Sequence, residues 1–157
     1  MQDRFKFRFW DIEESVMLPW DCICQTAFNC TRQEGNEIQK YGLMYRAFTT
    51  PLKYTPLQCT GLKDKNGKLI YEGDIVDCYV SSKKIYRYQI KQEISSFMLV
   101  SPKEEIFNFI NKWNDNVYPL SQLYFEYENK ENCIEQCEII GNIYENKDLL
   151  AKDTANE

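Results

Sequence analysis

Hydrophobic and polar residues alternate strictly near the start of the chain. Residues 4–10 read Arg-Phe-Lys-Phe-Arg-Phe-Trp. A period of two predicts a half-buried strand, with Phe5, Phe7 and Phe9 on one face and the basic side chains on the other. The polar residues that follow predict a turn, and Ser15 to Leu18 are expected to return as a second strand.

The stretch 20–54 shows no clean period. Within it, residues 22–28 are compatible with a strand. Pro51 and Pro56 bracket an expected loop, because proline lacks a backbone donor and interrupts regular structure. This loop leads into a short extended segment, Leu57 to Cys59.

Two tight turns organise the stretch from Thr60 to Val76, which holds three of the chain's six glycines. Asn66-Gly67 is the pair favoured in a type I′ hairpin turn, because both residues tolerate positive φ. The Asp64 carboxylate can accept hydrogen bonds from backbone N–H groups before that turn. Glu72-Gly73-Asp74 predicts a second reversal. The residues expected to shape these turns are Gly61, Asp64, Asn66, Gly67, Gly73 and Asp74.

After the turns the pattern predicts three short strands, at residues 74–80, 84–92 and 94–100. Tight connections between them favour a meander that curls into a small barrel. A helix is predicted over 102–113, because Ser101 is a good N-cap, proline follows it, and apolar residues recur at helical spacing.

The last third of the chain predicts less regular structure. Residues 119–127 fit either a strand or a short helix. Residues 138–144 predict a closing strand and residues 145–150 one helical turn, whereas the polar tail after Ala151 is expected to fray.

Composition narrows the class of protein. Aromatic residues make up 15% of the 157 residues, which suits strands and interfaces better than a helical bundle. No apolar run approaches the roughly 18 residues of a membrane span, and the N-terminus lacks the apolar core of a signal peptide. We therefore expect a cytoplasmic protein without a membrane partner. An odd number of cysteines, seven, then predicts reduced thiols rather than a disulfide framework.

Charge is unevenly distributed along the chain, whose net charge is −5. Residues 101–157 carry five basic and twelve acidic side chains, which gives −7 for that part. Residues 61–100 carry seven basic and five acidic side chains, which gives +2. Such a chain is not a general polyanion binder, although its middle offers a local basic face.

The absence of histidine excludes several catalytic arrangements. Neither a Ser-His-Asp nor a Cys-His pair is available, and no imidazole can bind a metal or carry a proton. The carboxylates of Asp64, Glu72 and Asp74 are the best candidates for an enzyme with a divalent cation. Carboxylates beside glycines at turns more often accept hydrogen bonds from nearby amides, so the structural interpretation is favoured.

Two cysteine pairs raise the alternative of a zinc site. They are Cys22-x-Cys24 and Cys133-x-x-x-Cys137, and neither has the usual spacing of a zinc knuckle. Free, largely buried thiols are the simpler interpretation. We therefore predict no metal and no cofactor.

Basic and aromatic residues interleave between positions 83 and 91. Small barrels bind single-stranded nucleic acid with such groups, which makes Lys84, Arg87 and Lys91 candidate contacts. Strand alternation places Tyr86 and Tyr88 on the face opposite Arg87 and Lys91, so these groups do not converge. A solvated strand with tyrosines packed beneath it is favoured.

Three segments together resemble the YopX-like proteins of phages and prophages. They are Lys6 to Asp11, Thr60 to Val76, and Ile140 to Asn146 with Leu149-Leu150. The resemblance spans almost the whole chain, and it implies a mostly β protein with an SH3-type barrel and no established enzymatic activity. The chain differs from that pattern in a longer, cysteine-rich stretch at 20–54 and in the helix at 102–113, which resembles an insertion.

The predicted fold is therefore mainly β with minor α content. We expect an N-terminal β-rich extension over 1–59, an SH3-like barrel over 60–150 with the helix 102–113 inserted, and a tail over 151–157. The predicted function is that of a phage or prophage accessory or regulatory protein in the bacterial cytoplasm. It would act without catalysis, as a homo-oligomer that binds a host or phage protein. A nucleic-acid-binding barrel is the alternative, and a metal-dependent enzyme is less favoured.

Overall fold

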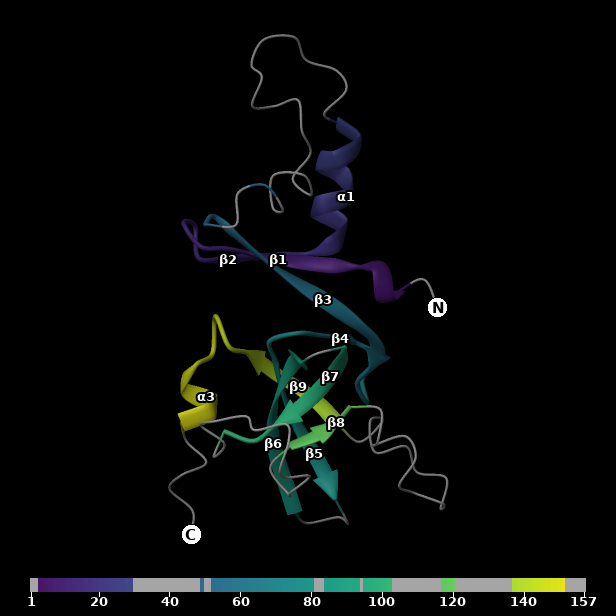
Figure 1. Ribbon diagram of the computed structural model, residues 1–157, viewed down its shortest axis with the longest axis vertical. Helices are drawn as coiled ribbons and strands as arrows, with labels where there is room; N and C mark the ends of the chain where they lie inside the picture. The colour runs from purple at the N-terminus through teal and green to yellow at the C-terminus, as the bar shows by residue number, and fades with distance from the viewer. Residues whose placement is uncertain are drawn as a thin grey trace. The chain divides into compact units, whose positions relative to one another are not determined.

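A computed structural model describes residues 3–29, 49, 52–80, 84–93, 95–102, 117–120 and 137–151. The chain divides into two units, Met1–Cys59 and Thr60–Glu157. Strand β3 (Tyr54–Lys63) begins in the first unit and ends in the second (Figure 1). No helix among the described residues is long and apolar enough to cross a bilayer.

The N-terminal unit contains a small antiparallel sheet and one helix. Its elements are η1 (Asp3–Phe5), β1 (Phe7–Asp11), β2 (Val16–Leu18), α1 (Trp20–Asn29) and the first half of β3. Strand β1 lies between β2 and β3. The buried core consists of Phe9, Ile23 and Tyr54, so α1 packs against the face of β1 that carries Phe9. The predicted strand over Ser15 to Leu18 is confirmed as β2.

The predicted strand at residues 4–10 is only partly correct, because the strand begins at Phe7. Phe7 and Phe9 share a face and stack with ring centroids 6.4 Å apart. Phe5 instead ends a 3-10 turn and is 76% exposed. The turn forms because Lys6 N donates to Asp3 O at 3.0 Å and the Lys6 ammonium lies 2.8 Å from the Asp3 carboxylate. The side-chain hydrogen bond from the Lys6 ammonium to the Asp3 carboxylate raises the pKa of Lys6.

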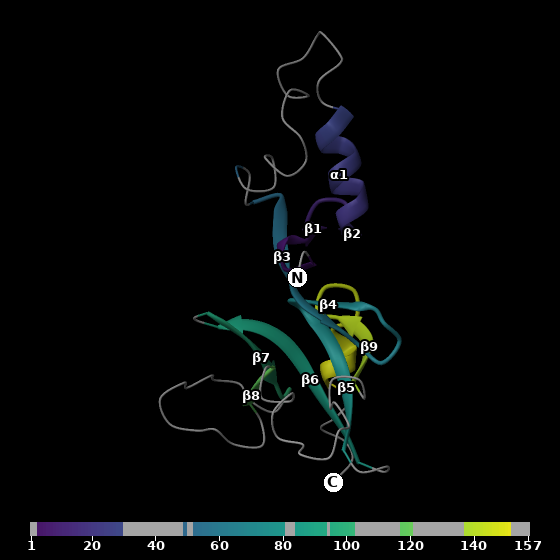
Figure 2. The ribbon, with the colours of Figure 1, turned by 90° about the vertical axis from the view of Figure 1, so that its right-hand side faces the viewer.

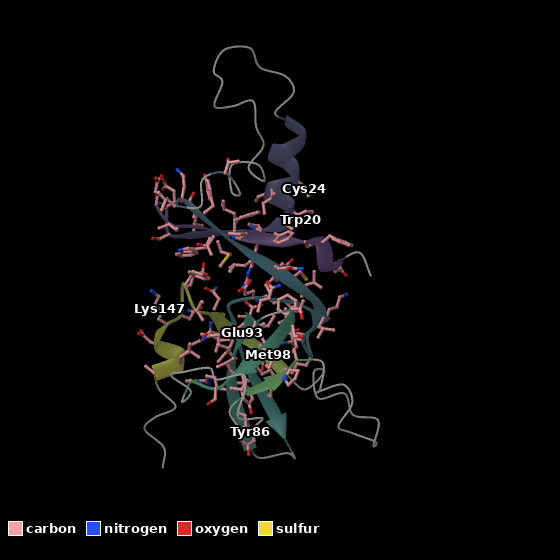
Figure 3. All side chains as sticks on the ribbon, viewed as in Figure 1. Trp20, Cys24, Tyr86, Glu93, Met98 and Lys147 are labelled. Carbon is pink, nitrogen blue, oxygen red and sulfur yellow. A yellow bond between two sulfur atoms is a disulfide. The ribbon has the colours of Figure 1, made fainter. Side chains whose placement is uncertain are left out.

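A strand at residues 22–28 is wrong, since this segment belongs to the helix α1. The helix begins after Pro19, whose carbonyl accepts a hydrogen bond from Ile23 N at 3.3 Å. Asp21 in the first turn favours a helix N-terminus, because its negative charge is attracted to the positive end of the helix dipole. Trp20 and Ile23 both belong to the packing around Phe9. Their helical spacing was the signal for a helix that the sequence contained. In Figure 3, Trp20 and Cys24 both lie on this helix.

Pro56 does not lie in a loop but within β3, opposite Phe9. Ile12 N donates to Lys53 O at 2.9 Å, and hydrogen-bonded pairs alternate with non-hydrogen-bonded pairs along an antiparallel ladder. Ile12 and Lys53 form a hydrogen-bonded pair, and Phe9 and Pro56 are the third pair after it along the ladder, so Phe9–Pro56 is a non-hydrogen-bonded pair. The missing N–H of Pro56 therefore removes no bond between β1 and β3.

The C-terminal unit is built on a five-stranded antiparallel sheet with the order β8-β7-β6-β5-β9. The predicted meander over residues 74–100 is confirmed. The elements of this unit after β3 are β4 (Leu69–Tyr71), β5 (Asp74–Val80), β6 (Lys84–Glu93), β7 (Ser96–Val100), β8 (Val117–Pro119), β9 (Cys137–Asn142) and α3 (Asp148–Ala151). The sheet curls along β6 (Figure 2). The predicted mainly β, barrel-like fold with minor helix is confirmed.

Alternation along the strands produces two buried clusters in this unit. One face carries Tyr88 and Ile90 of β6 with Leu99 of β7, and Ile70 of β4 packs against the same cluster. The other face carries a smaller cluster of Met98, Val100 and Val117. Tyr86 and Tyr88 stack at 6.4 Å and both pack with the larger cluster, as the strand alternation predicts.

The remaining predictions have different outcomes. The closing strand predicted at 138–144 is confirmed as β9, which ends at Asn142, and the helical turn before Ala151 is confirmed as α3. The predicted helix at 102–113 lies almost wholly outside the described residues, as do most of residues 119–127 and the tail from 152 onward.

The expectation of reduced thiols is wrong for two cysteines, because Cys78 and Cys137 form a disulfide. They lie directly opposite each other on β5 and β9, with Cα atoms 4.2 Å apart. An odd cysteine count does not reveal which residues the fold brings together. Among the described residues, Cys22, Cys24 and Cys59 are not part of a disulfide.

We predict that Gly141→Ala lowers the free energy of unfolding by about 2 kcal/mol, because a Cβ at this position overpacks its site. That Cβ would lie 2.6 Å from Asn146 Oδ1 and 2.9 Å from Asn146 Cβ. Urea denaturation measures the change. Gly67→Asn is the control: no atom lies within 4 Å of a Cβ there, and asparagine tolerates the local φ of +78°. Equal losses in the two variants would contradict the steric explanation.

Candidate functional site

The turn between β3 and β4 has a defined geometry. We call residues Asp64 to Lys68 the edge turn. Gly67 N donates to Asp64 O at 2.9 Å, and Asp64 N donates to Lys68 O at 2.8 Å. Gly67 has a φ of 78°, but Asn66 does not have a positive φ, so the predicted type I′ turn is wrong. A three-residue loop with a left-handed glycine at its end explains both hydrogen bonds.

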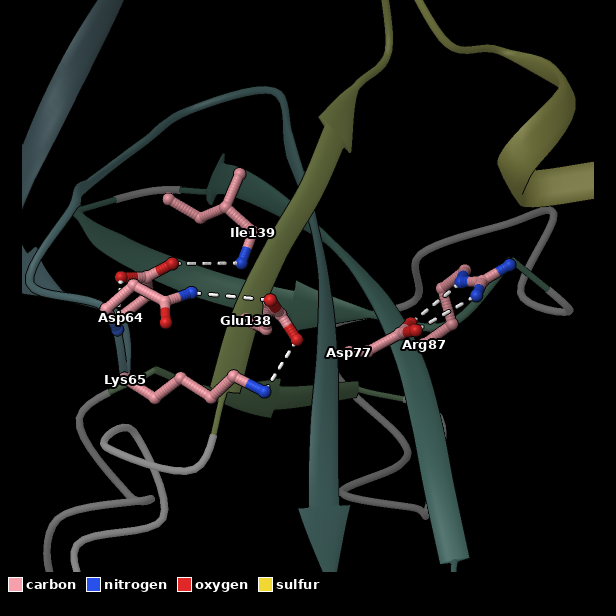
Figure 4. Close-up of polar contacts among 7 residues, drawn as sticks. Asp64, Lys65, Asp77, Arg87, Glu138 and Ile139 are labelled. Carbon is pink, nitrogen blue, oxygen red and sulfur yellow. Dashed lines mark hydrogen bonds and ion pairs between the residues drawn. The ribbon is translucent and has the colours of Figure 1, made fainter.

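The Asp64 carboxylate is buried and accepts three backbone hydrogen bonds. Its Oδ1 accepts from Asn66 N at 2.9 Å and from Lys68 N at 2.8 Å, both within the edge turn. Its Oδ2 accepts from Ile139 N in β9 at 3.2 Å (Figure 4). One side chain therefore shapes the edge turn and attaches it to a strand 75 residues away in sequence.

The edge turn covers the outer edge of β9. A Cα separation of 4.2 Å identifies Cys78–Cys137 as a non-hydrogen-bonded pair, so the backbone groups of Cys137 and Ile139 point away from β5. Lys65 N donates to Cys137 O at 2.9 Å, and the Lys65 ammonium lies 2.6 Å from the Glu138 carboxylate. These contacts and the Asp64 bond occupy groups that would otherwise offer an edge for strand pairing.

The second reversal, Glu72-Gly73-Asp74, is also held by hydrogen bonds to backbone groups. Gly73 has a φ of 80°, its N–H donates to Ile90 O at 2.8 Å, and its carbonyl accepts from Ile143 N at 2.9 Å. Asp74 is fully buried, and its Oδ2 accepts from Tyr71 N at 2.8 Å. Gly61, the third predicted turn glycine, has a φ of 81° within β3.

The closing segment from Gly141 to Asn146 meets the second reversal through the Gly73–Ile143 hydrogen bond. Asn142 Oδ1 accepts from Tyr144 N and Glu145 N, both at 3.0 Å. Asn146 Oδ1 accepts from Asn142 N at 3.2 Å in the space left by the absent Cβ of Gly141. The two segments that carry the family resemblance thus contact each other, and their side chains maintain the fold.

The structure places the candidate metal ligands in separate surroundings. The carboxylates of Asp64 and Asp74 accept backbone hydrogen bonds in two different turns. Among the described residues no group of three or more cysteine, aspartate or glutamate side chains could hold a metal ion. Cys22 and Cys24 lie on α1 in the N-terminal unit, Cys137 is in the disulfide, and Cys133 lies outside the described residues.

The candidate nucleic-acid contacts do not form a common basic platform within the described side chains. Arg87 Nε and Nη2 donate to the two Asp77 oxygens at 2.8 and 3.0 Å (Figure 4). Arg87 Nη1 donates to Leu149 O at 3.0 Å. Arg87 therefore connects β5, β6 and α3. Lys91 is half-buried, and the Lys84 side chain lies outside the description.

Sequence reasoning did not identify a group of exposed apolar side chains in the N-terminal unit. Ile12, Val16 and Leu52 are 45%, 43% and 92% exposed. We call these three residues the apical patch, because they lie at the end of the small sheet where β1 turns into β2. An apolar residue within the polar run Asp-Ile-Glu-Glu was the available signal.

Local contacts hold the apical patch in place. Asp11 Oδ1 accepts from Glu13 N at 3.0 Å and from Glu14 N at 3.1 Å, which fixes the turn that carries Ile12. Ile12 N donates to Lys53 O at 2.9 Å, which places Ile12 beside the residue that follows Leu52 in the chain. The Lys53 ammonium contacts Glu13 at 2.5 Å, and this hydrogen bond raises the pKa of Lys53. The three exposed side chains thus lie at a hairpin end whose backbone is held by hydrogen bonds, with charges of both signs beside them.

A protein-family model matches nearly the whole chain. The model of the YopX protein family matches residues 6–151. A crystal structure of protein EF1440 from Enterococcus faecalis is similar, with 24% sequence identity and a TM-score of 0.48. That match covers 92% of this chain and 96% of the other. No curated protein matches the chain.

We predict that Asp64→Ala lowers the free energy of unfolding by about 2 kcal/mol, because three partly buried backbone N–H groups lose their acceptor. Glu138→Gln, which removes only a half-exposed ion pair, should cost less than about 1 kcal/mol. Urea denaturation with and without Mg²⁺ measures both effects. Stabilisation of the unaltered protein by Mg²⁺ that disappears in Asp64→Ala would instead indicate a metal site.

Proposed function

This chain belongs to the YopX protein family, and on that premise we propose that it acts by binding other macromolecules and catalyses no reaction. In this proposal it is a phage or prophage accessory or regulatory protein that works in the cytoplasm of the bacterial host. It assembles as a homo-oligomer and presents a host or phage protein with a surface of the assembly.

The apical patch is the observation that carries the proposal. Of the described residues, the large apolar side chains with the greatest exposure all belong to the N-terminal unit. Exposed apolar groups that cluster on a fixed surface typically mark an interaction site. Three side chains are only the centre of such a site, since a stable interface buries about 1,200–2,000 Å² in total.

The charges around the apical patch favour a second copy of the chain as its occupant. Glu13 and Glu14 are exposed beside the patch, and Lys53 lies next to Glu13. A two-fold interface brings each residue of one copy against the same surface of the other. In that arrangement a surface that carries both signs of charge can face an identical surface without net repulsion, because Lys53 of one copy can approach Glu14 of the other.

The buried carboxylates support a role without catalysis. Asp64, Asp74 and Asp77 accept hydrogen bonds from turn amides or from Arg87. A catalytic acid or base must instead present its oxygen to a substrate. The side chains around the two turns are therefore employed in maintaining the fold, which leaves surface contacts as the means of action.

We predict that Leu52→Glu weakens self-association at least about tenfold, because it places a charge at the centre of an apolar interface. Leu52 is 92% exposed, so the substitution should leave the fold intact. Sedimentation velocity over a range of micromolar concentrations measures the association, and circular dichroism checks the fold.

Gln92→Glu is the matched control, since Gln92 is an exposed residue of the C-terminal unit and the change adds the same charge. It should associate like the unaltered chain. A monomeric unaltered chain throughout the concentration range would refute self-association, and equal association by Leu52→Glu would refute the apical patch as its site.

A further inference from the structure

We propose that the Cys78–Cys137 pair is a reversible redox switch that controls the edge of the barrel at β9. With the disulfide formed, the start of β9 is fixed to β5 and the edge turn stays in place. With the disulfide reduced, the start of β9 and the edge turn open together while the rest of the sheet remains folded. The redox role rests on the cytoplasmic location in the proposed function, because disulfides there are typically transient or redox-sensing.

The backbone holds the two sulfur atoms together independently of the bond. Cys78 and Cys137 are directly opposite in the ladder, and non-hydrogen-bonded pairs bring side chains closest. The next pair along the ladder is Asp77 with Glu138, followed by Val76 with Ile139. The pairs at the other end of β9, Asp74 with Asn142 and Ile75 with Gly141, keep the two strands in register after reduction. The thiols therefore meet again whenever the start of β9 closes, and the bond can form again without a search through conformations.

The two ends of β9 are held in different ways. At the Asn142 end, Ile143 N donates to Gly73 O and the side chains of Asn142 and Asn146 accept backbone hydrogen bonds. At the other end, Cys137 is the first residue of the strand, and the disulfide is its covalent attachment to β5. Loss of the disulfide should therefore loosen the Cys137 end selectively.

The contacts of the edge turn make that end a cooperative unit. Lys65 N donates to Cys137 O, and Ile139 N donates to Asp64 Oδ2. Glu138, which lies between these two residues of β9, forms an ion pair with Lys65 of the edge turn. Movement of residues 137–139 away from β5 therefore breaks the bonds of the edge turn, and it exposes backbone groups of β5 and β9. Edge groups of this kind can pair with another strand.

The position of Cys137 at the end of an edge strand gives a reagent access to the buried sulfur atoms. Cys78 and Cys137 are 4% and 2% exposed, so a reagent cannot reach them in the closed strand. Strand ends open locally at far lower free energy than the whole domain. Because Cys137 ends an edge strand, fraying of that end exposes its sulfur atom without global unfolding.

The chemistry is thiol–disulfide exchange with a small disulfide such as oxidised glutathione. One cysteine thiolate attacks a glutathione sulfur, which forms a mixed disulfide and releases one glutathione thiolate. The second cysteine thiolate then attacks the protein sulfur of that mixed disulfide and releases the other glutathione. The protein pair loses two electrons and two protons, and the glutathione disulfide gains both.

A purified full-length chain equilibrated in glutathione buffers of graded ratio provides the test. Alkylation followed by mass spectrometry measures the oxidised fraction of the Cys78–Cys137 pair. Amide hydrogen exchange, followed residue by residue by NMR, reports on the edge. Reduction should accelerate exchange of the Ile139 and Lys65 amides at least about tenfold, since both donate across the edge that opens. The Gly73 amide, which donates to Ile90 O, is the internal reference and should change far less.

Two variants distinguish the effect of losing the disulfide from the effect of losing a buried thiol. Cys137→Ala should show the fast edge exchange of the reduced chain in every buffer. Cys59→Ala, which removes a buried thiol outside the disulfide, should switch like the unaltered chain. If Cys137→Ala does not fold, chemical reduction of the unaltered chain gives the same measurement. The chain-entropy model gives a loss of about 10³-fold in the folding equilibrium constant on reduction, for a loop of 59 residues.

Three results with the purified chain would overturn the proposal. They are a pair that stays oxidised across all glutathione ratios, edge amides that do not respond to reduction, and global unfolding on reduction. These results are independent of the proposed binding function, which Leu52→Glu tests on the other unit. Rapid alkylation in intact bacteria gives the state of the pair in the cell. An oxidised fraction that changes with an added thiol oxidant supports the switch, and a constant fraction refutes it.

Discussion

One buried carboxylate sets the architecture of the C-terminal unit, because Asp64 accepts hydrogen bonds from two parts of the chain at once. Two of its bonds shape the edge turn, and the third attaches that turn to β9. An ionised carboxylate has two oxygens and about four acceptor positions, so it can satisfy three amides that no hydroxyl could serve together. Among the described residues, the turn that this side chain shapes covers the Cys137 end of β9, and the backbone groups it occupies there are not available to a second chain.

The glycine-rich turns and the asparagine-rich closing segment belong to the same structural device. Gly73 bonds with Ile143, and Gly141 makes room for the side chain of Asn146. These residues resemble a reactive signature in the sequence because acidic groups and glycines gather there. In the structure their polar atoms bond to backbone groups, so the features that identify the family are those that hold its fold.

Two features outside these turns suit a function. The apical patch offers apolar surface on a hairpin fixed by Asp11, and the Cys78–Cys137 pair offers a covalent state that can change. The first suits binding and the second suits control of an edge. They lie in different units, so a change in one need not disturb the other.

The sequence by itself determined the strands and glycine turns of the middle of the chain, because strand alternation and positive φ are consequences of local sterics. It misassigned α1 and Pro56, whose states depend on packing against Phe9 and on ladder register. The tertiary structure alone decided that Cys78 meets Cys137, that Asp64 reaches Ile139, and that Ile12 lies beside Lys53. Each of these contacts joins residues far apart in the chain, and local preferences carry no information about which distant strands become neighbours.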